Sequence, residues 1–248
     1  MSVSSVIPQG RRFQPLYRKL HTLSLLGMNY GGAARKDSER LVLDRLNATP
    51  VVFDGGANIG DYVDKVLKTR PRAQIYAFEP AADSFKALAA RFPSGVHLHE
   101  AALSDNDGEA TLYSDEPMSE SASIFPQQRW HWTVPAEFEP QGSVRTLTVD
   151  RVCAENAIER IDLLKLDVEG AEIAALRGAP QMLAEHRIGL IQFEYGLPAL
   201  SARVCLRDFF ELLEGWTIHR LVRDGLVPIA YDGRWEIACA TNYVAIPG

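Results

Sequence analysis

The chain has 248 residues, of which 46% are hydrophobic, so it is long enough to bury one sizeable core. The formal net charge of −6 and the pI near 5.6 argue against a basic surface that binds a phosphate backbone. Nucleic acid is therefore excluded as the expected partner. Cys153, Cys205 and Cys239 are odd in number and far apart, which excludes a paired zinc site and predicts a reducing, cytoplasmic location.

The N-terminal region carries positive charge followed by an apolar patch. Arg11, Arg12, Arg18 and Lys19 precede the patch Leu23–Met28. The patch is too short to span a bilayer and lacks a convincing small-residue cleavage site, so neither a membrane span nor a signal peptide is expected. Two interpretations stay open: helices that pack on the main domain, or a basic amphipathic helix that contacts a membrane surface.

A glycine-rich turn follows the first predicted strand. The run Val51–Phe53 is apolar and rich in β-branched residues, whereas Asp61–Lys68 has helical spacing, so a strand-to-helix turn lies between them. Glycine tolerates positive φ there and lets the backbone approach a ligand closely. The candidate cofactor-binding residues of this turn are Asp54, Gly56, Asn58 and Gly60.

The charge at this turn narrows the choice of cofactor. An unpaired carboxylate at Asp54 would repel a pyrophosphate, whereas a ligand with a cationic amine and no phosphate suits it better. S-adenosylmethionine is such a ligand, because it carries an ammonium, a sulfonium, a ribose and an adenine. The second apolar run, Gln74–Phe78, leads into Glu79, where an acid binds ribose hydroxyls, and Pro80 stops the strand.

The chain then continues to alternate between helices and strands. A helix is predicted over Ala82–Phe92, a third strand over Val96–Ala102, and a hairpin strand outside the nucleotide core over Glu109–Tyr113. This order with short connections predicts a parallel sheet that binds its ligand at the carboxyl ends of the strands.

Residues 114–143 form the least regular part, with four prolines, several serines and the cluster Trp130-His131-Trp132. A loop of this length is usually functional or disordered, and we expect a lid over the acceptor pocket that excludes water. The two tryptophans either stack on a sugar ring or another apolar ligand face, or anchor the loop. His131 is a candidate general base, and a solvent-facing loop histidine is the alternative.

The fourth strand, Ile161–Leu166, leads directly into Asp167 and Glu169. Two-residue alternation places both carboxylates on one side if the chain stays extended, although Gly170 indicates a turn soon after. Methyl transfer needs an aligned acceptor oxygen and a group that takes its proton. Asp167 accepts that proton, holds the methionine ammonium, or orients a base supplied by Glu169, Glu194 or His131, and these roles stay open.

Two further carboxylates lie near this edge. Glu194 ends the fifth predicted strand, Ile188–Phe193, whereas Glu172 lies in a first helical turn, where the amide dipoles stabilise an acid. Asp167, Glu169 and Glu194 together have the oxygen ligands that a divalent cation needs, but such acids also occur without metal. The candidate catalytic residues are Asp167, Glu169, Glu194 and His131, and no metal site is predicted.

Four motifs resemble, in order, those of the FkbM family of S-adenosylmethionine-dependent methyltransferases. They are Phe53-Asp54-Gly55-Gly56-Ala57-Asn58-Ile59-Gly60, Phe78-Glu79-Pro80, Ala102-Leu103-Ser104-Asp105 and Leu164-Lys165-Leu166-Asp167-Val168-Glu169-Gly170-Ala171-Glu172. The resemblance runs from about Val51 to about Tyr195. Asn58 stands where many methyltransferases have another glycine, a departure that is common in this family.

The resemblance implies a Rossmann-like class I methyltransferase fold of the α/β class, with a mostly parallel seven-stranded sheet flanked by helices and an antiparallel last strand. We expect a helical extension over residues 1–45, as family members often carry, and a methyltransferase domain over residues 46–248. The cofactor site implied by the resemblance comprises the turn residues, Glu79 and Pro80, the run Ala102, Leu103, Ser104 and Asp105 bordering adenine, and Asp167.

The expected activity is O-methylation of a hydroxyl on a small molecule or a glycan, of the sugar or polyketide type. One alternative is a catalytically silent module that keeps the core pattern but loses the cofactor acids, which are present here. The other is an NAD-dependent oxidoreductase, against which Asp54 counts because a pyrophosphate would lie beside it. Acceptor identity and oligomeric state are not predicted.

Overall fold

The computed structural model describes residue 8 and residues 10–28, 30, 35–116, 118–129 and 136–248. Its helices, in chain order, are η2 (Arg11–Phe13), α1 (Gln14–Gly27), α2 (Arg35–Leu43), α3 (Asp61–Thr69), α4 (Ala82–Arg91), α5 (Val149–Glu155), α6 (Glu172–Arg177), α7 (Pro180–Ala184), α8 (Leu197–Ser201), α9 (Leu206–Leu212) and η3 (Gly233–Trp235). Its strands are β1 (Val51–Gly55), β2 (Gln74–Phe78), β3 (His97–His99), β4 (Ala102–Leu103), β5 (Gly108–Ser114), β6 (Gln128–Arg129), β7 (Ala136–Glu137), β8 (Glu139–Leu147), β9 (Ile161–Leu166), β10 (Ile188–Tyr195), β11 (Trp216–Val222), β12 (Gly225–Pro228) and β13 (Thr241–Pro247).

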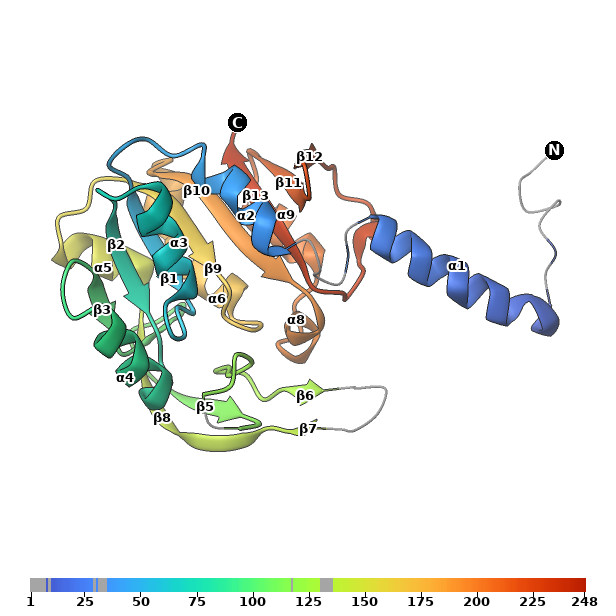
Figure 1. Cartoon of the computed structure of the whole chain (residues 1–248), viewed down its shortest axis with the longest axis horizontal. Helices are drawn as coiled ribbons and strands as arrows, with labels where there is room; N and C mark the ends of the chain where they lie inside the picture. Colours follow the sequence, from blue (N-terminus) through green and yellow to red (C-terminus); the bar gives the residue numbers. More distant parts are fainter. Residues whose placement is uncertain (1–7, 9, 29, 31–34, 117, 130–135) are drawn as a thin grey trace.

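The central sheet has eight strands in the order β12-β11-β13-β10-β9-β1-β2-β3 (Figure 1). Strands β3, β2, β1, β9 and β10 pair in parallel, whereas β13 is antiparallel to both β10 and β11. The predicted seven-stranded, mostly parallel sheet is confirmed. It gains one short edge strand, β12, because the turn after β11 folds back into a hairpin.

The third predicted strand is shorter than expected and splits in two. Only His97–His99 pairs with β2, since the chain turns where Ala101 donates to the His99 carbonyl. Ala102 and Leu103 instead pair with β8, in a second sheet of order β4-β8-β5. The predicted hairpin strand is β5, and its partner β8 begins at Glu139, inside the stretch expected to be irregular.

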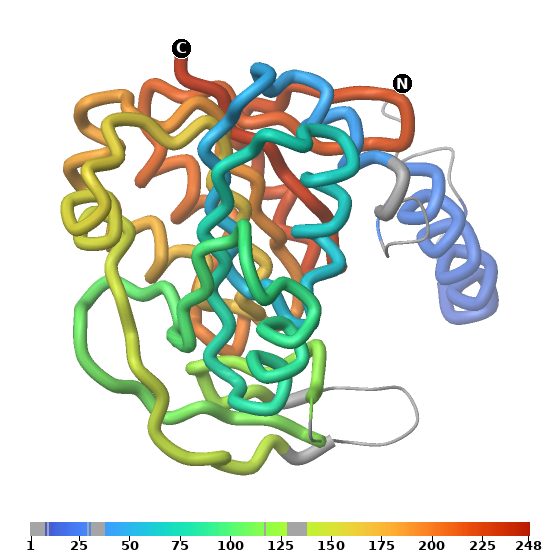
Figure 2. The backbone as a smooth tube through the Cα atoms, turned by 60° about the vertical axis from the view of Figure 1, so that its left-hand side comes forward, coloured from blue at the N-terminus to red at the C-terminus, as the bar shows by residue number. Residues whose placement is uncertain are grey.

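Helices cover both faces of the central sheet, as the two views in Figures 1 and 2 show. On one face, α2, α3 and α4 pack on the apolar residues of the strands through Val42, Val63 and Leu88. On the other face, α5, α6, α7 and α9 build the larger core. The carboxyl ends of β1, β2, β9 and β10 therefore meet at one edge between these two layers.

The N-terminal helices α1 and α2 differ in how they pack on the body of the protein, which comprises the central sheet and the helices that cover it. Helix α2 buries Val42 and Leu43 against the sheet. Helix α1, all of whose residues the structure describes, buries none of them and extends away from the body (Figure 1). No helix among the described residues is long and apolar enough to cross a membrane. All three cysteines are described and none forms a disulfide.

Candidate functional site

The glycine turn connects β1 to α3 and lies against the end of β9. The N–H groups of Gly56 and Ala57 both donate to the Phe78 carbonyl at 3.0 Å, which ties the turn to the end of β2. Gly56 has a φ of 75°, and a Cβ there would lie 1.9 Å from the carbonyl oxygen of Asp167. Glycine is required here by conformation and by space, and the close approach places Asp167 beside the turn.

Gly60 lies where α3 packs against α4. It has a φ of 88° at the start of α3, and a Cβ there would lie 2.4 Å from the Phe92 ring and 2.8 Å from a Leu88 methyl group. Its missing side chain therefore lets α3 approach α4. Gly60 does not line the cavity beside Glu79, and its expected part in the cofactor site stays a prediction.

Glu79 follows β2 and faces the glycine turn. Its carboxylate accepts hydrogen bonds from the N–H groups of Asn58 and Ala81, each at 2.8 Å. Burial raises the pKa of Glu79, and these two hydrogen bonds oppose that rise. Each carboxylate oxygen has a second acceptor position, so Glu79 retains the capacity to bind a hydroxyl pair. A cavity of about 40 Å³ lies beside it, lined also by Asn58 and Pro80.

The opposite wall of this cavity comes from a segment within the predicted lid. Ser119, Ala122, Ser123 and Ile124 all line it. The Ser123 hydroxyl donates to the Glu169 carbonyl at 2.8 Å, which ties the segment to the turn after β9. The cluster Trp130-His131-Trp132 lies outside the described residues, so His131 stays a prediction.

Asp54 does not line the cavity beside Glu79. It is fully buried in β1, and its Oδ1 atom lies 2.8 Å from the Nζ atom of Lys165 on the neighbouring strand β9. Burial raises the pKa of Asp54 even though Lys165 works to lower it. Burial works to lower the pKa of Lys165, but Asp54 and Asp167 hold it above its usual value. The carboxylate is thus paired with a cation of the protein, and its expected part in the cofactor site stays a prediction.

Lys165 is a buried charged residue beside the site that the sequence analysis did not single out. A single lysine between Leu164 and Leu166 in an apolar strand was the available signal, because a buried lysine needs a charged partner. Lys165 pairs in register with Asp54 on β1 and with Gln192 on β10, so the three residues form a buried polar row across three strands. Tyr62 of α3 closes the row, since its hydroxyl donates to Gln192 at 3.3 Å.

The chain turns immediately after Asp167. Glu169 has a φ of 51°, so the extended geometry that would align its side chain with Asp167 is absent at this described residue. The Glu172 carboxylate accepts hydrogen bonds from the N–H groups of Val168 and Gly170, so it stabilises the turn ahead of α6. Burial raises the pKa of Glu172 to about 7. Glu172 is thus a buried acid at the first position of α6 that holds the preceding turn in place.

The structure brings three of the candidate catalytic acids together. Asp167, Glu169 and Glu194 line one small cavity beside α8, and Glu194 lies within β10 rather than after it. Among the described residues, no group of three or more His, Cys, Asp or Glu side chains is arranged to hold a metal ion.

A larger cavity, of about 350 Å³, adjoins the glycine turn on the side of α2 and α3. Asp167 lies where this cavity meets the one beside Glu79, because both are lined by Gly56, Asn58, Glu120 and Asp167. The other lining side chains are predominantly polar and include Glu39, Asp61, Lys65, Lys165 and Glu169. This space suits a ligand rich in hydrogen-bonding groups.

The predicted adenine border is placed only in part. Ala102 and Leu103 line the cavity beside Glu79, whereas Ser104 and Asp105 do not. The Ser104 N–H donates to the Leu147 carbonyl at 3.0 Å, because β4 continues its pairing with β8 at this point. Ala102 and Leu103 are therefore the two residues of this run beside the cavity, and the part of Ser104 and Asp105 in an adenine border stays a prediction.

Known proteins are similar to this chain in sequence and in fold. A 2-O-methyltransferase, NoeI, of Sinorhizobium fredii is 30% identical over 184 residues, which are 68% of this chain and 73% of NoeI. A hexuronic acid methyltransferase, AglP, of Haloferax volcanii is 26% identical over 65% of this chain and 63% of its own length.

A crystal structure of a methyltransferase FkbM from Methylobacillus flagellatus aligns with a TM-score of 0.56 and 14% identity. The alignment covers 88% of this chain and 49% of the other, so this chain spans about half the length of that protein. The methyltransferase FkbM domain family itself matches residues 54–215. The glycine turn, Glu79 and the acidic edge all lie within the matched range, and the chain belongs to the FkbM methyltransferase family.

Proposed function

We propose that this methyltransferase uses S-adenosylmethionine to methylate a hydroxyl oxygen on a sugar or another small polyhydroxylated acceptor. The observation that carries the proposal is the position of Glu79, buried beside the glycine turn with acceptor capacity facing a cavity. The names of the relatives NoeI and AglP support an oxygen acceptor on a sugar-type molecule.

The residues beside the turn fit this cofactor. Glu79 would accept the ribose hydroxyls, Ala102 and Leu103 would border the adenine, and the turn at Gly56 and Asn58 would hold the methionine end. The Oδ1 atom of Asn58 is buried without a hydrogen-bond partner among the described atoms, so it has a free acceptor position for a donor such as an ammonium. When bound, the cofactor supplies an activated methyl group on a sulfonium, which is a good leaving group.

Cofactor entry requires movement of the segment Ser119–Ile124. The cavity of about 40 Å³ is far smaller than the roughly 300 to 1,000 Å³ of ordinary small-molecule sites. The contacts that hold the segment include the bridge between Tyr113 and Ser123 and the hydrogen bond from Ser123 to Glu169. We expect it to shift outward as the cofactor binds and to cover the site afterwards.

Asp167 is our candidate for the group that takes the acceptor proton. Its side chain is 28% exposed, and its Oδ2 atom lies 3.9 Å from the Nζ atom of Lys165. It lines both cavities, so it lies where the acceptor hydroxyl and the methyl group would meet. Glu169 and Glu194 remain alternatives for this proton transfer.

The test is incubation of the purified protein with methyl-labelled S-adenosylmethionine and a panel of sugars and glycosides, followed by mass analysis of the products. We expect methyl transfer to oxygen, and we expect Asp167→Asn to lower turnover far more than it weakens binding of S-adenosylhomocysteine. Equal losses of turnover and binding would make Asp167 a binding residue. Methylation of nitrogen or carbon only would contradict the proposal.

A further inference from the structure

Helix α1 presents an unpartnered apolar stripe. Leu16, Leu20, Leu23 and Leu26 are 52%, 49%, 64% and 59% exposed. The first three follow the spacing i, i+4, i+7, so they lie on one face of the helix. Four exposed leucines in fourteen residues are far more than isolated surface hydrophobics, and such a contiguous stripe marks an interaction surface.

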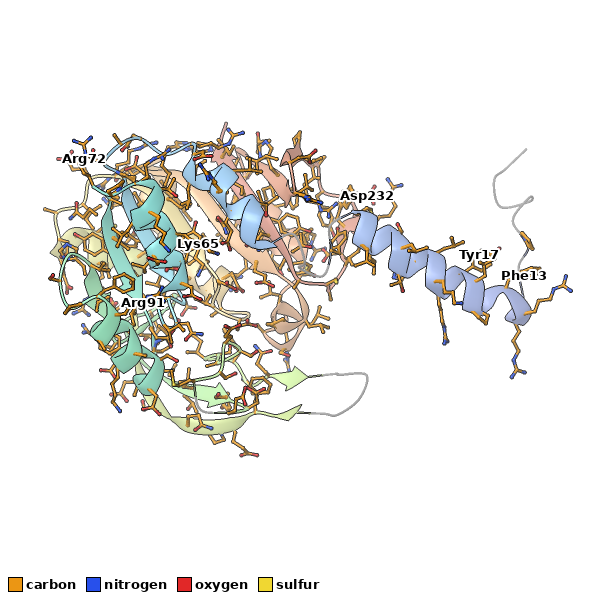
Figure 3. All side chains as sticks on the ribbon, in the orientation of Figure 1. Phe13, Tyr17, Lys65, Arg72, Arg91 and Asp232 are labelled. Carbon is orange, nitrogen blue, oxygen red and sulfur yellow. The ribbon has the colours of Figure 1, made fainter. Side chains whose placement is uncertain are left out.

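Among the described residues, contacts with the body lie just beyond the C-terminal end of the helix. Just after it, the Arg220 side chain donates to the Met28 carbonyl, and the Arg220 guanidinium lies 4.1 Å from the centroid of the Tyr30 ring. Tyr30 is buried, whereas α1 itself projects away, with Tyr17 on its far half and Phe13 just before it (Figure 3). The leucine stripe is therefore free to meet another surface.

The charge of this region is opposite to that of the whole chain. Residues 8–28 contain Arg11, Arg12, Arg18 and Lys19 but no Asp or Glu, although the chain carries a net charge of −6. An anionic surface therefore attracts this region while the rest of the protein is repelled. Two copies of α1 packed together would instead bring four like charges close, two from each Arg18 and Lys19 pair, which disfavours self-association through this helix.

We propose that α1 binds an anionic membrane surface, with its leucines inserted at the headgroup boundary and its basic residues on the lipid phosphates. A 14-residue helix is about 21 Å long, shorter than the ~30 Å hydrocarbon core, so it lies in the interface and does not cross it. Apolar burial and attraction to anionic lipid are the two contributions that hold interfacial helices of this kind. The proposal is independent of the methyltransferase activity.

The test is sedimentation of the full chain with vesicles of phosphatidylcholine alone or mixed with phosphatidylglycerol. We expect binding to the anionic vesicles only, weakened by salt. Leu20→Gln with Leu23→Gln removes apolar contact without changing charge, and Arg18→Gln with Lys19→Gln removes two charges. Each pair should weaken binding at least about tenfold.

His21→Gln with Thr22→Gln is the matched control, because it places two glutamines on the same helix away from the leucine stripe and should leave binding unchanged. All variants should keep the wild-type melting temperature, since α1 buries no side chain. Failure to bind anionic vesicles, or equal loss in the control pair, would overturn the proposal. So would a concentration-dependent dimer, seen by light scattering, that only the leucine variants abolish.

Discussion

The Nζ atom of Lys165 lies 2.8 Å from the Oδ1 atom of Asp54, and both side chains are buried between adjacent parallel strands. This pair changes the interpretation of the glycine turn. The carboxylate at its entrance is neutralised within the protein, so charge at Asp54 no longer argues against a pyrophosphate. Family membership is what now separates a methyltransferase from a dehydrogenase.

Removing one member of this pair should be costly. Lys165→Met leaves the Asp54 carboxylate buried without its cation, and we expect a loss of about 3 to 5 kcal/mol in the free energy of unfolding. The double variant Asp54→Asn, Lys165→Met should recover most of the loss, as measured by urea denaturation. Lys68→Met is the control, because the Lys68–Asp64 pair is largely exposed and should cost about 0 to 1 kcal/mol. A loss no larger than the control would show that the pair is not important for stability.

Gly56→Ala should disrupt the turn more than its backbone conformation alone predicts. Gly56 and Gly95 have φ values of 75° and 83°, but a Cβ at Gly95 meets no described atom within 4 Å, whereas one at Gly56 meets the Asp167 carbonyl. We expect Gly95→Ala to cost about 1 to 2 kcal/mol and Gly56→Ala about 1 to 3 kcal/mol more, because of overpacking. Thermal unfolding of both variants measures the difference, and similar melting temperatures would contradict it.

Glu172 should make stability fall as the pH rises. Its folded pKa of about 7 lies above the ordinary value of 4.5, so the folded state holds a proton that the unfolded state has released. The contribution is fully present below pH 4.5 and is lost progressively as the pH rises to about 7, by up to about 3 kcal/mol.

Urea denaturation across this pH range measures the slope. Glu172→Gln should flatten it, because the amide does not titrate and its oxygen can still accept a hydrogen bond from Gly170. Glu211→Gln, at an exposed position of α9, is the control and should leave the slope unchanged. An unchanged slope in Glu172→Gln would assign the pH dependence to other buried acids such as Glu79.

The sequence was sufficient to predict the main sheet, because strands with β-branched and aromatic runs alternate with helices of clear apolar spacing. The prediction failed where pairing between segments far apart in the sequence determines which strands form. Ala102 leaves the third strand for β8, a partner more than forty residues away, and no local pattern indicates that choice. The extra strand β12 is likewise created by a hairpin at the sheet edge.

At the site, motif spacing placed Glu79, Gly56 and Asp167 at one edge, because parallel strands end there together. It could not predict the partner of Asp54, because the burial and partner of a carboxylate depend on register with Lys165 on another strand. It could not predict the packing of Gly60 either, because the contact with Phe92 forms only when α3 and α4 pack.

The most direct measurement is calorimetric titration of the purified protein with S-adenosylhomocysteine, with NAD as a parallel titrant and Glu79→Gln and Glu79→Ala as variants. We predict binding to the wild type in the micromolar range or tighter, and a loss of roughly 10- to 150-fold in Glu79→Ala, equivalent to about 1.5 to 3 kcal/mol. Glu79→Gln keeps one acceptor oxygen toward the turn, so it separates a binding defect from a folding defect. No binding by the folded wild type, or binding of NAD instead, would contradict the account.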